Sequence, residues 1–403
     1  MAAPTSAPQT LKFTGSKYLI QRLVLATLTG RAIRVSQIRA SSHTSPGLAA
    51  HEVSFLRLLE SITNGSHIEF SYTGTTLLYK PGLITGAATG HGLTTGGAIR
   101  HELPADCTRS ASYFLIPLCL LAPFSKAQMN VLLTGPGVIT SATETGDVSV
   151  DTIRTAILPL FKSFGIERNL ELRILRRSNA GRDGKGGGGE VQLVFDHQVR
   201  LPKTIHLLDA GRIKRVRGVA YSTGVAGANN ARLIEAARGV LNDLVPDTYI
   251  FSDISSAPLV AGLEKNNPGA KRKTGLGFGL SLVAESNTNM LYSADIASLP
   301  AGGEAPEDLG RKCAYQLLES IEAGGCASGV AATSVLTLMA MGSEDVGRIT
   351  LSKDVVGSEQ VVQLARDLRG FGMSGWGMRE DDDGEIVVSI VGKGVGNVGR
   401  KIA

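Results

Sequence analysis

A cluster of cationic residues near the middle of the chain has the composition of a phosphate-binding segment. Arg212, Lys214, Arg215 and Arg217 are interleaved with apolar residues. If this stretch is extended, Arg212 and Lys214 lie on one face and Arg215 and Arg217 on the other, so RNA phosphates can be met from either side. A solvated edge strand that its charges protect from further pairing explains the same pattern. The stretch therefore predicts either an RNA contact or a protected edge.

The histidines do not form a recognisable nucleophilic site. No arrangement of serine, histidine and aspartate follows from the spacing of the seven, which are His43, His51, His67, His91, His101, His197 and His206. His43 lies in a loop near Arg39, and the two are candidates for holding an anion, although a turn residue explains His43 as well. His51 shares a helical face with apolar neighbours, which favours a core histidine.

Two glycine motifs resemble nucleotide-binding signatures but lack the other parts. Gly184 and Lys185 end like a P-loop, yet the first glycine and the hydroxyl residue after the lysine are absent. The second motif, Gly394, Gly396 and Gly399, precedes no helix that could receive a pyrophosphate. The four cysteines form no CxxC pair and have no histidine at ligand spacing. We therefore expect no cofactor, no metal and no disulfide, and a reducing, intracellular setting.

The elements that position these residues follow a repeated order. The apolar pattern predicts a strand, a buried helix, a strand, an amphipathic helix and a hairpin, and this order returns from residue 99 and again near the C-terminus. Because neither layer can bury its apolar face alone, each repeat is expected to be a four-stranded sheet covered by two helices. The predicted fold is α/β (α+β), with two repeats in residues 1–218, an inserted smaller α/β domain in 219–326, and the third repeat in 327–403.

Residues 348–371 show this plan in the third repeat, as a strand, a short polar loop and an amphipathic helix that Ser358 opens. Helical spacing predicts a buried stripe of Val361, Leu364, Ala365 and Leu368. Arg366, Asp367 and Arg369 are then left for solvent or a partner. An ordinary charged helix face is the alternative to a functional one.

Composition limits the classes of function. A chain of 403 residues with 43% hydrophobic and 19% charged residues predicts a folded soluble protein of more than one domain. The net charge of +5 and the pI near 9.0 favour an anionic partner such as RNA, although many basic proteins bind none. The N-terminus lacks the pattern of a signal peptide, and the longest apolar segment is too short for a membrane span. The loop 266–274 carries Lys271, Arg272 and Lys273. This cluster is interpreted as an RNA contact, a nuclear localisation signal or an ordinary solvated surface loop.

Several segments resemble the RNA 3′-terminal phosphate cyclase superfamily over nearly the whole chain. They are IRVSQIR, IRASSHTSPGLAAH, LLYKPGLITG, VDTIRTAILPLFKSFGI and the GGGGEV strand. Four further segments resemble the eukaryotic cyclase-like proteins of this superfamily, which act in ribosome assembly. They are KYLIQRLVLATLTGR, ASYFLIPLCLLAPF, LSLVAES and VGKGVGN. The resemblance implies three repeats with an inserted α/β domain, in agreement with the periodicity.

The chain departs from the pattern of active cyclases at three places. Their EGGGQ segment matches residues 13–17, Phe-Thr-Gly-Ser-Lys, which leaves Lys17 as a candidate anion-binding residue. An Asp-Gln pair matches Thr333 and Ser334. The histidine that takes the adenylyl group from ATP falls at or near Asp354. A carboxylate cannot replace the neutral imidazole that forms a phosphoramidate, so the resemblance implies that cyclase activity is absent.

The resemblance further implies a nucleolar, non-catalytic factor of small-subunit ribosome assembly. Such a factor is needed for early cleavage of the rRNA precursor and binds a ribosome-assembly GTPase and processome proteins, with no small-molecule substrate and no membrane. The alternative is an RNA endonuclease in which Arg366 and Arg369 bind the RNA phosphate and Asp367 acts as the general base. The same three residues are otherwise interpreted as contacts with the protein partner. A working cyclase is the least favoured reading.

Overall fold

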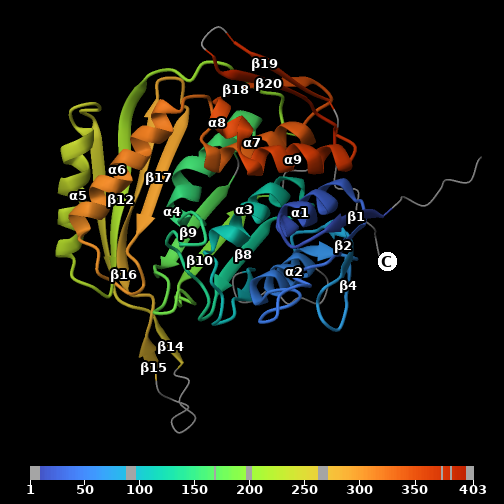
Figure 1. The fold of residues 1–403 in the computed structure, drawn as a ribbon, viewed down its shortest axis with the longest axis horizontal. Coiled ribbons are helices and arrows are strands. Elements are labelled where there is room, and N and C mark those ends of the chain that lie inside the picture. Colours follow the sequence, from blue (N-terminus) through green and yellow to red (C-terminus); the bar gives the residue numbers. More distant parts are fainter. Residues whose placement is uncertain are drawn as a thin grey trace, which may run out of the picture.

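The computed structural model describes residues 10–87, 97–167, 169–196, 202–261, 271–373, 375–381 and 384–395. They form three repeats and an insert, and in Figure 1 the insert lies at the left while the repeats fill the centre and right. The first repeat consists of β1 (Leu11–Thr14), α1 (Leu19–Thr29), β2 (Ile33–Ser36), α2 (Ala50–Ile62), β4 (His67–Phe70) and β5 (Leu77–Lys80), with a short ribbon of β3 (Thr63–Asn64) and β6 (Leu83–Ile84). Its sheet has the order β1-β2-β5-β4, in which only β1 and β2 run parallel.

The second repeat has the same topology, with sheet order β7-β8-β10-β9. Its elements are β7 (Ile99–Glu102), α3 (Ser112–Leu121), η1 (Ala122–Phe124), β8 (Met129–Thr134), α4 (Val150–Thr152), η2 (Ile153–Ile157), η3 (Leu158–Phe164), β9 (Leu170–Arg176) and β10 (Glu190–Phe195). The predicted helix over residues 150–164 is present, but it changes from α through a π turn to 3-10 turns. Pro159 has no amide hydrogen to donate, which favours such irregular turns over a continuous α-helix.

The third repeat completes the pattern with sheet order β11-β18-β20-β19. It consists of β11 (His206–Leu207), α7 (Gly329–Met341), β18 (Val346–Leu351), α8 (Lys353–Gly357), α9 (Glu359–Gly370), β19 (Trp376–Glu380) and β20 (Ile386–Val391). Its first strand, β11, pairs with β18 although it precedes the insert in the chain. The insert therefore interrupts the third repeat and does not separate the second from the third, contrary to the predicted boundaries.

The insert is a four-stranded sheet of order β13-β12-β16-β17, with α5 and α6 packed against each other and against its strands. Its elements are β12 (Ile213–Thr223), α5 (Ala228–Leu241), β13 (Thr248–Ser255), β16 (Gly277–Ser286), β17 (Leu291–Ala297) and α6 (Pro306–Glu322). Because β12 begins at Ile213, the predicted boundary between residues 218 and 219 falls inside a strand. Lys271, Arg272 and Lys273, predicted in a loop, form the exposed strand β15 (Lys271–Lys273), which pairs with β14 (Leu259–Ala261); residues 266–270 of that loop lie outside the described residues.

The core is organised by one nearly all-buried helix from each repeat, namely α1, α3 and α7. α3 contacts both α1 and α7, and α9 packs against α1 and α7. These helices are apolar around most of their circumference, as expected for helices with protein on every side. Within the described residues, no helix is long and apolar enough to cross a membrane.

Candidate functional site

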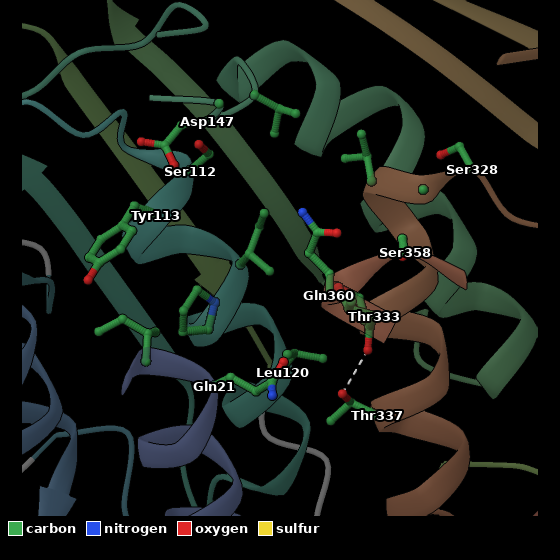
Figure 2. Close-up of a pocket in the computed structure, with 18 of the residues that line it drawn as sticks. Gln21, Ser112, Tyr113, Leu120, Asp147, Ser328, Thr333, Thr337, Ser358 and Gln360 are labelled. Carbon is green, nitrogen blue, oxygen red and sulfur yellow. Dashed lines mark hydrogen bonds between the residues drawn. The ribbon is translucent and has the colours of Figure 1, made fainter. Parts of the chain in front are cut away.

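A cavity of about 670 Å³ lies where the three central helices meet the start of α8 and α9. Each repeat contributes to its wall: Ile20, Gln21 and Val24 from α1, Ser112, Ile116 and Leu120 from α3, and Thr333, Ser334 and Thr337 from α7. Figure 2 shows Gln21, Thr333 and Gln360 around this space, with Thr337 donating to the backbone oxygen of Thr333 at 2.7 Å. The wall is a mixture of aliphatic side chains, hydroxyls and amides.

The structure brings together two of the three places at which the sequence departs from the pattern of active cyclases. Asp354, Thr333 and Ser334 line the same cavity. Asp354 is exposed in the first turn of α8, which the Ser352 hydroxyl caps by accepting from the amide of Val355 at 3.3 Å. A carboxylate in this turn is stabilised by the positive end of the helix dipole. The helix terminus thus favours a carboxylate at Asp354, at or near the position where the resemblance expects the nucleophile.

The single cation among the described lining residues is already neutralised. Arg109 donates through Nε to Asp147 at 2.6 Å and lies 4.2 Å above the ring of Tyr113. Burial alone would lower the pKa of Arg109, but its hydrogen bonds to Asp147 and the charge of that carboxylate outweigh burial and raise the pKa. With Asp354 unpaired, the described lining carries a surplus of negative charge, and none of these lining residues is a histidine. Such a wall disfavours a triphosphate.

Lys17, the candidate anion-binding residue of the first repeat, does not line this cavity. Its ammonium group pairs with Glu359 at the start of α9, and both side chains are exposed. An exposed pair of this kind contributes little to stability, because water screens its charges. The pair links the first repeat to the third and leaves no free charge at this position.

The prediction that Asp367 is left for solvent or a partner is wrong, because it is buried within the chain. Asp367 is 2% exposed and accepts from Gln21 Nε2 and Gln363 Nε2, each at 2.8 Å, and from Arg22 Nε at 3.3 Å. Arg22 is also buried and lies 4.6 Å from the ring centre of Phe13. Asp367 therefore joins α9 to α1 through a buried ion pair.

Its two neighbours do lie where the periodicity puts them. Arg366 and Arg369 are exposed on α9, while Val361, Leu364 and Leu368 are buried and Ala365 is half-buried. Neither arginine side chain has a hydrogen-bond or ion-pair partner among the described residues. The predicted charged face of α9 therefore consists of these two cations without the aspartate.

The other candidate anion-binding residues of the first repeat have structural roles. Arg39 donates to the carboxylate of Glu52 and, through Nε, to the backbone oxygen of Gly47 at 2.8 Å. Glu52 in turn accepts from the amide of Ala49 at the start of α2. Arg39 thus fixes the loop before α2, in which His43 is exposed. His51, predicted in the core, is half-buried with its ring edge-on to Tyr113, and burial lowers its pKa.

The cationic stretch is an edge strand only in part: Lys214 and Arg215 lie where β12 pairs with β16 alone, whereas from Val216 onward the strand lies between β13 and β16. Lys214 and Arg215, predicted on opposite faces, both reach Glu285, at 2.7 and 2.6 Å, since the pairing of β12 with β16 shifts register between residues 213 and 215. Arg217 pairs with Asp247 at 2.9 Å, and Arg212 is exposed just before the strand. Most of the predicted phosphate-binding charge is thus neutralised within the insert.

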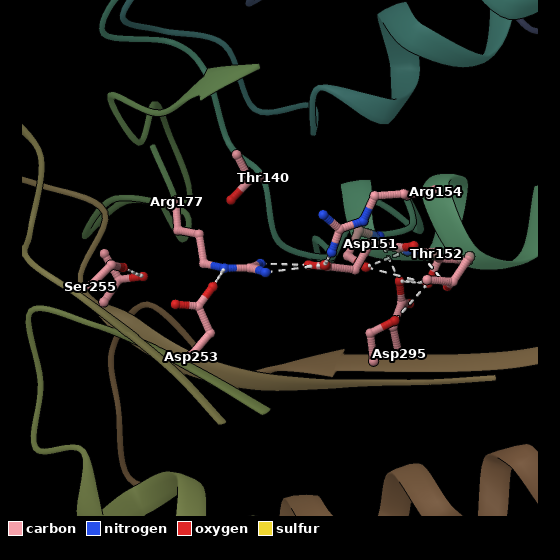
Figure 3. Close-up of polar contacts among 12 residues, drawn as sticks. Thr140, Asp151, Thr152, Arg154, Arg177, Asp253, Ser255 and Asp295 are labelled. Atoms are coloured by element: carbon pink, nitrogen blue, oxygen red, sulfur yellow. Dashed lines mark hydrogen bonds and ion pairs between the residues drawn. The ribbon is translucent and has the colours of Figure 1, made fainter. Parts of the chain in front are cut away.

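A polar network that the sequence analysis did not predict joins the insert to the second repeat. The buried guanidinium of Arg177 donates to Asp151 through Nη1 at 2.5 Å and through Nε to Asp253, as Figure 3 shows. Asp295 of β17 accepts from the Thr152 hydroxyl at 2.7 Å, and burial raises its pKa. Asp253 and Asp295 come from the insert, far along the chain from their partners, so no local spacing could have revealed the network.

The chain is thus built from three repeats of one topology around a shared cavity, with an α/β insert in the third. The chain belongs to the family described as RNA 3′-terminal phosphate cyclase, whose sequence model matches residues 11–371. Its relatives include the rRNA processing protein rcl1 of Schizosaccharomyces pombe, 40% identical over 98% of this chain and 99% of that protein.

Two further relatives cover nearly the same length. The RNA 3′-terminal phosphate cyclase-like protein of Mus musculus is 41% identical over 90% of this chain and 88% of its own. The rRNA processing protein RCL1 of Saccharomyces cerevisiae is 35% identical over 99% of this chain and all of its own length. The resemblance found in the sequence is thereby confirmed at the level of the family and its cyclase-like members.

Proposed function

We propose that this chain is a non-catalytic member of the cyclase family that acts in rRNA processing. Specifically, we propose that it acts in the nucleolus, where it is required for early cleavage of the small-subunit rRNA precursor and binds a ribosome-assembly GTPase. The names of its relatives support the rRNA step. The observation that supports the loss of catalysis is that Asp354, at or near the position where the resemblance expects the nucleophilic histidine, lines the cavity.

The chemistry of the cavity supports this proposal. A neutral imidazole can attack a phosphorus atom and leave a reactive phosphoramidate, whereas the carboxylate of Asp354 repels the triphosphate that it would have to attack. The cation that could offset this repulsion, Arg109, is held by Asp147. Thr333 and Ser334, which the resemblance matches to an acid and an amide of active cyclases, offer hydroxyls to the cavity.

The endonuclease alternative loses the base that was suspected for it. A general base must reach the proton that it removes, and Asp367 is buried against Arg22, Gln21 and Gln363. The exposed Arg366 and Arg369 remain available for contact with RNA or with a protein partner. We therefore assign to α9 a binding role.

Two measurements test the proposal separately. Purified protein incubated with radiolabelled ATP is expected to acquire no covalent label, and RNA with a 3′-phosphate is expected to remain uncyclised; either product would refute the loss of catalysis. In cells depleted of the native protein, the wild-type chain should restore cleavage of the small-subunit precursor. Unchanged accumulation of the uncut precursor, despite normal protein levels, would refute the role in rRNA processing.

A matched pair of variants tests the binding role of α9. Arg366→Glu with Arg369→Glu is expected to fold normally but to lose binding to precursor RNA or to the GTPase, measured with the purified components. Lys162→Glu with Arg173→Glu reverses two exposed cations on the second repeat and serves as the control. Equal binding by both variants would remove α9 from the interface.

A further inference from the structure

A groove of about 1150 Å³ lies between the insert and the third repeat. Its walls are the C-terminal half of α6, the chain that follows α5, helix α8 and the turn before β20. Leu244 and Tyr315 are 64% and 54% exposed in it, and Leu318 and Ile321 are half-buried beside them. Large apolar side chains gathered in a groove at this exposure are typical of an interaction surface.

Helix α6 presents a different set of residues on each of its faces. Leu309, Cys313 and Leu317 are buried toward the insert sheet. Tyr315, Leu318, Glu319 and Glu322 recur at helical spacing on the opposite face and line the groove. Leu318 on this outer face still packs partly against the core, whereas Tyr315 is not among the residues that pack against it.

The charge of the groove decides which class of partner fits it. Its lining includes four carboxylates, on Glu319, Glu322, Asp354 and Glu385, and one lysine, Lys353, which Glu380 holds at 2.7 Å. Glu385 accepts from the amide of Gly325, but Glu319, Glu322 and Asp354 have no side-chain partner among the described residues. Elsewhere in the structure, acids such as Glu52, Asp147 and Asp151 are paired with arginines. These free carboxylates repel nucleic acid and attract a cationic ligand.

We propose that this groove binds a basic amphipathic segment of a protein partner. Apolar side chains of the segment pack against Leu244 and Tyr315, and its lysines or arginines face Glu319 and Glu322. This is the usual arrangement for a helix in a groove, in which apolar anchors give affinity and complementary charge gives orientation. Asp354 lines both the groove and the cavity, so the bound segment lies beside the cavity mouth. The proposal goes beyond the role in rRNA processing and does not depend on it.

The experiment uses the full chain and a synthetic probe. A fluorescein-labelled peptide of about 14 residues, with leucines at helical spacing and arginines elsewhere, is titrated with protein and followed by fluorescence anisotropy. A permuted peptide of the same composition but without the helical spacing is the control. The protein is expected to bind the periodic peptide at least about tenfold more tightly than the permuted one, and more weakly as salt is raised.

Variants of exposed groove residues locate the binding. Leu244→Ser with Tyr315→Ser, and separately Glu319→Lys with Glu322→Lys, should each weaken binding by about tenfold or more. The control Glu60→Lys with Glu235→Lys reverses exposed acids outside the groove and should change nothing. Glu319→Gln with Glu322→Gln repeats the test if the reversed pair does not fold. Absence of saturable binding, equal affinity for the permuted peptide, unaffected groove variants, or displacement of the peptide by single-stranded RNA would each overturn the proposal.

Discussion

Replacing Asp367 by alanine is expected to destabilise the protein and not merely to alter its surface. The side chains of Arg22 and Asp367 are 9% and 3% exposed, so the substitution leaves a buried guanidinium without its counter-charge. Removing one partner of such a buried pair costs about 3–5 kcal/mol. Since single domains are commonly stable by only about 5–15 kcal/mol, this loss is a large fraction of the total.

The single tryptophan makes the change measurable in the relevant repeat. Trp376 lies in β19, in the same repeat as α9, so urea unfolding followed by its fluorescence reports the free energy of unfolding there. Arg366→Ala with Arg369→Ala changes exposed side chains on the same helix and should stay within about 0.5 kcal/mol of wild type. The pair Arg22→Met with Asp367→Leu, which removes both charges and fills the space, should recover most of the loss.

The result that refutes this reasoning is a stable Asp367→Ala protein. If its free energy of unfolding lies within about 1 kcal/mol of wild type, the pair between α1 and α9 is not maintained in solution. If Asp367→Ala is destabilised as expected, a loss of rRNA processing in that variant reports unfolding and carries no information about an endonuclease. The double arginine variant is then the proper test of the α9 surface.

Three further predictions concern other buried or cavity groups. Burial lowers the pKa of His101 to about 4, whereas a histidine in the unfolded chain titrates near 6.5. The free energy of unfolding should therefore fall by about 3 kcal/mol as the pH drops from 6.5 to 4. His101→Gln should remove most of this dependence, as measured by urea unfolding at each pH. Asp354→His should still acquire no adenylate from labelled ATP, because Thr333 and Ser334 remain unlike the residues of active cyclases; a labelled band would show that a single substitution restores the nucleophile. Arg177→Met leaves the carboxylate of Asp151, which is 1% exposed, without its main partner and should destabilise the junction with the insert by about 3–5 kcal/mol, so limited proteolysis should release the insert sooner; an unchanged digestion rate would contradict this.

The repeats could be predicted because their signals are local. The helices α1, α3 and α7 are runs of apolar residues bounded by turns, and the strands around them alternate or contain β-branched residues. The strand β11 escaped prediction because two residues carry no periodicity, and it belongs to its sheet only through pairing with Arg348 and Ile349. The extent of the third repeat therefore had to come from the structure.

The exposure of a charged side chain could be predicted only where the helix had a single packed neighbour. The spacing of Val361, Leu364 and Leu368 correctly placed one buried stripe, but α9 is also covered by α1, and periodicity does not reveal a second neighbour. The partners of Lys214 and Arg215 on β12 likewise lie on another strand, at Glu285. Asp354 was found at the cavity only because a family resemblance marked its position.

The ion pair of Arg22 with Asp367 spans 345 positions of the chain, which has a consequence for biosynthesis. Protein synthesis proceeds from the N-terminus, so Arg22 emerges long before any carboxylate of α9 exists to accept from it. Until then, Arg22 lies without its carboxylate partner on α1, a helix whose other side chains are mostly apolar and buried in the complete fold. α1 gains its last neighbour, α9, only when the third repeat has been translated. Contacts of such long range form late and slowly. A nascent or truncated chain that lacks α9 should therefore expose α1 to chaperones and proteases, so that only complete chains persist.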